Sequence, residues 1–199
     1  MRTFRILLWV LVAIAGAAFA YLQFRPAPQQ PPQGSALAIS EIGGPFTLVG
    51  SNGQPFSSAS LAGKPYAIFF GFTHCPDVCP TTLARLVKLR KQLNEGERPF
   101  EILFVTVDPE RDGSAEVGKY ADLFNSPIIG LTGSPAQVTQ VKKQFGIFSN
   151  KVPDSSGGGY SVDHTATVLL FDRNGKFTGT IAPEEQDSAA LSKLRRIAA

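Results

Sequence analysis

The sequence contains very little cysteine and histidine, which limits the chemistry it can support. Its 199 residues include two cysteines, Cys75 and Cys79, and two histidines, His74 and His164. A structural zinc site normally takes four protein ligands, and no third cysteine is present to complete one. The two cysteines lie four positions apart, directly after the apolar run 66–72. Their proximity predicts a local site, which could be a disulfide staple, a redox-active dithiol or a metal site.

Charged residues are absent from the N-terminal stretch 6–24. At about 1.5 Å per residue, a helix of this length spans the ~30 Å core of a bilayer. Two arginines precede the stretch and one follows it closely, so the positive-inside rule puts the N-terminus in the cytoplasm. We expect residues 1–25 to anchor the protein in the cell inner membrane by a single pass, with the folded part in an oxidising periplasm. The alternative is a cleaved signal peptide, because residues 18–20 (Ala-Phe-Ala) are similar to a cleavage site.

The rest of the chain has no excess of either charge. The sequence contains 19 Lys and Arg and 16 Asp and Glu, and three of the arginines lie in the first 25 residues, which hold no acidic residue. The remaining residues therefore carry 16 charges of each sign. Without a basic surface the protein is not expected to bind nucleic acid.

Proline and glutamine dominate residues 26–39, which we expect to form a stiff, extended linker. Residues 40–199 suffice for one domain with a full core, and they contain no internal repeat. Strands alternate with helices and then give way to a hairpin, which predicts an α/β fold with a mixed central sheet flanked by helices. Strands are expected at 45–49, 54–56, 66–72, 100–107, 128–131, 166–171 and 176–181, and helices at 80–94, 114–124, 135–145 and 183–197. The intervening segment 147–165, with three glycines in a row, is expected to be a mobile loop.

The cysteine segment follows the carboxyl end of the 66–72 strand, where open α/β sheets place their sites. Proline is favoured at the first position of a helix, so Pro80 predicts that Cys79 caps the following helix and that Cys75 precedes it. The partial positive charge of a helix N-terminus favours thiolate over thiol. A disulfide here would close a five-residue ring and stabilise the fold by only about 2 kcal/mol. We therefore favour a working dithiol or a metal site over a staple.

The two histidines differ in their suitability as ligands. His74 adjoins Cys75, but alternation along a strand points neighbouring side chains to opposite faces. His164 lies in a loop immediately before the strand expected at 166–171, and position alone does not make it a ligand. Two thiolates with one imidazole form a soft donor set that suits copper as Cu(I) or Cu(II).

Two motifs together resemble the SCO/SenC family: GFTHCPDVCP at 71–80 and Asp-His-Thr at 163–165. The resemblance extends over residues 40–199. It implies a membrane-tethered, thioredoxin-like protein that takes part in building the dinuclear copper centre of cytochrome c oxidase. Under this resemblance Cys75, Cys79 and His164 are the copper ligands.

Further family positions are matched by Asp77, between the cysteines, and by Asp163, beside the histidine. The resemblance leaves open whether they tune the site or are solvated loop residues. The segment 105–112 (VTVDPERD) also resembles the family, and we interpret it as part of the fold, with Pro109 in a turn and Asp112 as a cap.

Two functions remain open, and the sequence does not decide whether the protein is an enzyme. The first is a copper metallochaperone for the copper-bearing subunit of the oxidase. The second is a thiol-disulfide oxidoreductase in which Cys75 and Cys79 reduce that subunit or another periplasmic copper chaperone, and are themselves reduced by a thioredoxin-like protein. A peroxidase is a weaker third reading, since no peroxidatic motif stands out. His164 separates the first two, because copper binding needs it and dithiol exchange does not.

Overall fold

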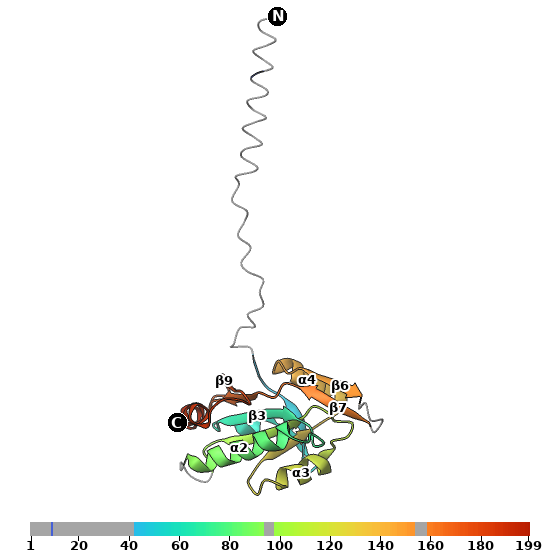
Figure 1. Cartoon of the computed structure of the whole chain (residues 1–199), viewed down its shortest axis with the longest axis horizontal. Coiled ribbons are helices and arrows are strands. Elements are labelled where there is room, and N and C mark those ends of the chain that lie inside the picture. The colour runs from blue at the N-terminus through green and yellow to red at the C-terminus, as the bar shows by residue number, and fades with distance from the viewer. Residues whose placement is uncertain (1–8, 10–41, 94–97, 154–158) are drawn as a thin grey trace, which may run out of the picture. The chain divides into compact units, whose positions relative to one another are not determined.

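The computed structural model of the protein describes residue 9 and residues 42–93, 98–153 and 159–199 (Figure 1). Contacts divide the chain into two compact units, Met1–Ala36 and Leu37–Ala199. Except for Trp9, which is helical, the expected anchor and linker lie outside the described residues. Within the described part of the chain, no helix has the length and apolar character needed to cross a membrane.

A seven-stranded sheet with the order β2-β1-β5-β4-β3-β8-β9 forms the centre of the second unit. Its strands are β1 Thr47–Gly50, β2 Pro55–Ser57, β3 Tyr66–Gly71, β4 Glu101–Thr106, β5 Ile129–Thr132, β8 Val168–Phe171 and β9 Phe177–Ile181. The central strands β3, β4 and β5 are parallel, and the outer pairs are antiparallel. The predicted mixed α/β sheet is therefore confirmed.

Every residue of β3 and β4 is buried, which explains why both strands are almost continuously apolar. A strand of a parallel sheet that is covered on both faces has no solvent-facing side to carry polar residues. Phe69 and Phe70 are adjacent in β3 and point to opposite faces, and neither is exposed. Each face of the sheet therefore has its own layer of aromatic packing.

In the described part of the chain, α-helices cover both faces of the sheet (Figure 1). They are α2 Val78–Gln92, α3 Ser114–Asp122, α4 Pro135–Gln144 and α5 Asp187–Ala198, and a short 3-10 helix spans Ser58–Leu61. Helix α5 packs on α2, and both lie on one face with α3, whose Tyr120 ring lies 5.0 Å from Phe104 of β4. The opposite face packs against α4, since Phe145 at its end lies 5.6 Å from Phe70. The β3-α2-β4 and β4-α3-β5 units run in the same direction, so right-handed crossovers place α2 and α3 on one face.

Helix α2 begins at Val78 with Asp77 as its N-cap, two residues earlier than predicted. Cys79 is therefore the second helical residue rather than the cap, and Pro80 is the third. The first residues of a helix have no intrahelical partner for their N–H groups, so a proline is tolerated at this position. The consequence is that Cys79 is held by the regular geometry of the helix.

The segment 147–165 is not the loop that its glycines suggested. Its described residues form β6 Ser149–Pro153 and β7 Tyr160–His164, which pair antiparallel as a separate two-stranded sheet. In Figure 1 this sheet lies beside α4, and Lys142 of α4 donates a hydrogen bond to Ser149 Oγ at 2.6 Å. Residues 154–158 lie outside the described part, and the predicted mobility stays a prediction.

The predicted caps at the start of α3 were wrong. Gly113 is the N-cap and Ser114 is the first helical residue. Asp112, expected to be a cap, is fully buried and binds other elements instead. By contrast, the proline predicted to begin α4 does so, and Ser134 and Gln137 form a capping box there.

Candidate metal centre

The two cysteines lie where β3 passes into α2. Cys79 is buried in the first turn of α2, and Cys75 is half-buried in the loop before it. The Cys79 N–H donates a hydrogen bond to Cys75 Sγ at 3.3 Å, and both thiols are free. Gly71 at the end of β3 makes room for this arrangement, because a Cβ there would lie only 2.7 Å from Cys79 Sγ.

His164, the last residue of β7, brings an imidazole to the two thiols. Its Nε2 atom lies 3.5 Å from Cys79 Sγ, and its Nδ1 atom lies 3.0 Å from the carbonyl oxygen of Thr165. Because a carbonyl can only accept, Nδ1 carries the proton, and Nε2 presents its lone pair to the thiols. Phe69 and Phe72 contact the ring edge-on, with centroid distances of 6.0 and 5.8 Å. The imidazole is thus fixed in both tautomer and orientation.

The electrostatic states of the two thiols differ. A hydrogen bond from the Cys79 thiol lowers the pKa of Cys75 to about 4, and the backbone N–H groups of Cys79 and Asp77 act in the same direction against the effect of burial. The pKa of Cys79 is raised, because its thiol donates to Cys75 and is buried. At neutral pH the pair therefore holds one proton, with Cys75 as thiolate and Cys79 as thiol.

Donor atoms from Cys75, Cys79 and His164 all lie within 4.8 Å of one another. Two sulfurs and one imidazole nitrogen are soft ligands, which suit copper better than magnesium or calcium. The donor set therefore fits a copper ion without any residue having to come from elsewhere in the fold.

The other sequence-predicted residues lie outside this cluster. His74 is exposed, and its Nδ1 is 3.6 Å from Asp112 rather than near the thiols. Asp77 occupies the N-cap position of α2 without a capping hydrogen bond from its side chain, which instead accepts one from Thr81 Oγ1 at 3.2 Å. Asp163 is exposed on β7, opposite Asn150. A tuning role for either aspartate stays a prediction.

The sequence did not reveal the buried polar contacts that support the centre. Asp112 accepts hydrogen bonds from the N–H and hydroxyl of Thr73, at 2.9 and 2.6 Å, and from the hydroxyl of Thr106 at 2.7 Å. Thr73 lies two residues before Cys75, so Asp112 anchors the cysteine loop. A signal was present: Asp112 closely follows β4, a parallel neighbour of β3, and the carboxyl ends of such strands share one edge of the sheet.

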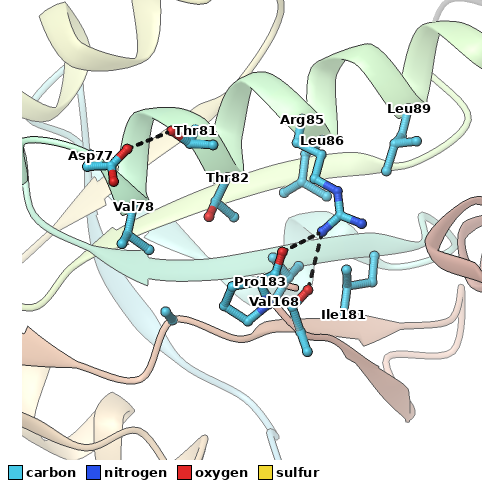
Figure 2. A pocket seen from close by; sticks show the side chains of 12 residues that line it. Asp77, Val78, Thr81, Thr82, Arg85, Leu86, Leu89, Val168, Ile181 and Pro183 are labelled. Carbon is cyan, nitrogen blue, oxygen red and sulfur yellow. Dashed lines mark hydrogen bonds between the residues drawn. The ribbon is translucent and has the colours of Figure 1, made fainter. Parts of the chain in front are cut away.

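A narrow groove of about 140 Å³ runs beside the centre, between α2 and the segment that joins β9 to α5 (Figure 2). Asp77 and Val78 line it next to Cys79, and Ala166 lines it two residues after His164. Arg85 crosses one side and donates hydrogen bonds to the carbonyls of Ala182 and Pro183. None of the three donor residues lines the groove, and Arg85 ties α2 to the C-terminal part of the fold.

The mixed α/β fold, with a dithiol and an imidazole at one edge of its sheet, places the protein among thioredoxin-like proteins that have a metal-binding site. Comparison with known proteins identifies the family: the SCO1/SenC profile matches residues 35–199, and the chain belongs to that family.

Individual relatives agree with this assignment. The mitochondrial SCO2 homologue of Bos taurus is 36% identical over 98% of this chain and 75% of its own. The structure of Bradyrhizobium japonicum ScoI with copper bound is 38% identical, covers 78% of this chain and 99% of its own, and superposes with a TM-score of 0.71. BsSco, a member of the Sco family of cytochrome c oxidase assembly proteins, is 23% identical over 80% of this chain and 94% of its own; its TM-score of 0.61 shows the shared fold.

Proposed function

We propose that this protein is a copper metallochaperone that binds copper through Cys75, Cys79 and His164 and delivers it to the dinuclear copper centre of cytochrome c oxidase. The observation that carries the proposal is the convergence of two sulfurs and one imidazole nitrogen within 4.8 Å. The copper-bound state of the similar Bradyrhizobium protein supports the choice of metal. The family resemblance supports the oxidase as the destination.

The three donor side chains differ in whether they must lose a proton before they can bind a soft cation. Cys75 is already a thiolate at neutral pH, and His164 Nε2 already presents its lone pair. Cys79 still carries its proton, so binding by both sulfurs must release that proton. The half-exposed Cys75 is the sulfur that a copper donor or acceptor can reach first, whereas Cys79 lies fully buried behind it.

A second function, thiol-disulfide exchange, is favoured by the same difference in pKa and exposure between the two thiols. The Cys75 thiolate would attack a disulfide sulfur of a partner, forming a mixed disulfide and releasing one partner thiolate. Cys79, after losing its proton, would then attack Cys75 Sγ, forming the Cys75–Cys79 disulfide and releasing the second partner thiolate. The partner disulfide is reduced, the protein dithiol is oxidised, and a thioredoxin-like reductant is needed to restore it. In this reaction the partner is an oxidase subunit or another copper chaperone.

The proposal includes a place in the cell. We propose that residues 1–25 hold the protein in the inner membrane with the metal centre in the periplasm. The uncharged stretch 6–24 and the arginines before it support this orientation. A tether keeps the centre near a client that is itself a membrane protein, which raises the effective concentration of one for the other.

Complementation under copper limitation separates the two functions. A strain that lacks the protein is supplied with His164→Ala, Cys75→Ser or Cys79→Ser. If copper delivery is the function, all three variants fail to restore oxidase activity at low copper. Full activity of His164→Ala with failure of both cysteine variants would overturn the copper proposal and support dithiol exchange. His74→Ala serves as the control, because this exposed histidine lies outside the cluster.

A further inference from the structure

The loop between β4 and α3, residues 107–113, contacts both parts of the chain that supply the metal centre. These are the cysteine segment after β3, here called the thiol arm, and the strand β7 that carries His164, here called the imidazole arm. At its start, the Val107 N–H donates to the Gly71 carbonyl at 2.7 Å, directly beside the cysteine segment. At its end, Asp112 binds Thr73 and thereby fixes the loop that carries Cys75. Neither of these contacts involves the strand that carries His164.

A separate set of contacts joins the same loop to that strand. Asp108, which is fully buried, accepts a hydrogen bond from the Tyr160 hydroxyl at 2.9 Å. The guanidinium of Arg111 is ion-paired with Asp108 and also donates from Nη1 to the Tyr160 carbonyl at 2.9 Å. Tyr160 is the first residue of β7, and His164 is the last. Both the backbone and the side chain of Tyr160 are therefore tied to this loop.

Arg111 also contacts the aromatic residues around the imidazole. The centre of its guanidinium lies 3.8 Å from the centroid of the Tyr160 ring and 5.8 Å from that of Phe72. Phe72 in turn packs edge-on against His164, at 5.8 Å between centroids and an interplanar angle of 88°. A planar guanidinium can stack on rings and donate in its plane simultaneously, which an ammonium group cannot do.

We infer that Arg111 is a positioning residue that holds β7 so that His164 Nε2 reaches the two thiols. Asp112 fixes the thiol arm, and the Arg111–Asp108–Tyr160 contacts fix the imidazole arm, with both sets rooted in one short loop. The separation between the sulfurs and the nitrogen is thus set by this loop, although Cys79 and His164 are 85 residues apart in the sequence. The predicted effect of Arg111 on copper affinity rests on the proposed function, whereas its role in holding β7 is a property of the copper-free protein.

The first measurement concerns the copper-free full-length protein. Arg111→Met keeps the aliphatic stem but removes the charge and the hydrogen bonds. We expect amide hydrogen exchange at residues 160–164 to speed up more than the loss of global stability explains. Arg85→Met is the matched control, since Arg85 is also a half-buried arginine that binds backbone carbonyls and an aspartate, but at the α5 side of the fold. Unchanged exchange at 160–164 in Arg111→Met, or an equal change there in Arg85→Met, would overturn the inference.

The second measurement is the affinity of the reduced protein for Cu(I), by competition with a chromophoric chelator. Loss of residues that orient a metal ligand typically weakens metal binding about 10- to 100-fold, and we expect a loss in this range for Arg111→Met. In a His164→Ala background the same substitution should cause no further loss, because the ligand it positions is already absent. Additive losses in the double variant would contradict positioning through His164.

Two further variants keep the test decisive if Arg111→Met does not fold. Tyr160→Phe removes only the hydroxyl that binds Asp108, and should give a smaller change in exchange and affinity in the same direction. Arg111→Lys keeps the charge without the planar fork, and should recover only part of the affinity. Wild-type behaviour of Tyr160→Phe would overturn the inference. If the wild-type protein binds no copper, the proposed function fails, while the exchange measurement still decides the role of Arg111.

Discussion

The two cysteines are chemically unequal, and the inequality comes from their positions at the start of α2. Cys75 lies in the loop, is half-exposed, and accepts hydrogen bonds from Cys79 and from backbone N–H groups. Cys79 lies one turn further along, fully buried against Gly71. A thiolate is stabilised where donors point at it, and a thiol is stabilised where it is desolvated. Cys75 is therefore suited to meet a copper ion or a partner sulfur first, and Cys79 is suited to bind it afterwards from inside the fold.

This inequality predicts the pH dependence of alkylation. An unfolded cysteine has a pKa near 8.5, so its reaction with iodoacetamide slows progressively below about pH 8. Because the folded pKa of Cys75 is about 4, its thiolate should persist as pH falls and be lost only near pH 4. Mass spectrometry of the reduced, copper-free protein at pH 6 should show Cys75 modified well before Cys79. Equal labelling of the two cysteines, or a midpoint near pH 8, would contradict the proposed charge state.

At the scale of elements, the centre depends on how closely α2 approaches the end of β3. A Cβ on Gly71 would lie 2.7 Å from Cys79 Sγ and within 3.1 Å of atoms in Phe69 and Phe104. Real Cβ atoms essentially never come that close to a neighbour. Glycine is therefore needed at residue 71 to leave space for Cys79 Sγ, and not because of its backbone conformation.

The substitution Gly71→Ala should consequently displace Cys79 and strain the core. Overpacking of this kind costs about 1–3 kcal/mol, and denaturant unfolding should show the loss. Gly113→Ala is a suitable control, because a Cβ there meets only the tip of the Glu116 side chain, which can move. Wild-type stability and unchanged Cys79 reactivity in Gly71→Ala would contradict the claim that Cys79 Sγ needs the space left by Gly71.

Some elements could be predicted from the sequence because local patterns determine them. Strands β3 and β4 are buried on both faces, so their composition alone identifies them. The strand β6 could not be found this way, because its sequence SNKVP is mostly exposed and pairs only with β7. Its existence depends on a partner strand rather than on a hydrophobic pattern, and such context commonly outweighs strand propensity.

The residues of the candidate site likewise divide into those that a local sequence pattern reveals and those that depend on partners far away in the sequence. Cys75 and Cys79 are recognisable from their spacing, but position alone left His164 undecided until the family resemblance was considered. The position of Asp112 after β4 indicates only the edge of the sheet at which it lies. Its contact with Thr73 and that of Arg111 with Tyr160 could not be predicted, because these partners lie 39 and 49 residues away in the sequence. From the sequence alone, the buried Asp112 looks like a capping residue, because the donors that surround it are not visible there.

For the whole molecule, the proposed function requires that the metal domain stay near a membrane-bound client. The expected anchor, residues 1–25, should place the protein in the membrane fraction, resistant to extraction by high salt and released by detergent. N-terminal sequencing of the purified protein should find the uncleaved segment. Recovery of a form that begins near Tyr21 in the soluble periplasmic fraction would instead support the signal peptide.

The most direct test of the central claim is a Cu(I) titration of the reduced, full-length protein. The account predicts one tightly bound copper per chain, and loss of tight binding in Cys75→Ser and in Cys79→Ser, because each leaves a single thiolate. His164→Ala should bind more weakly than wild type, and His74→Ala should bind as wild type does. Stoichiometric Cu(I) binding at unchanged affinity in either cysteine variant would contradict the assignment of the centre.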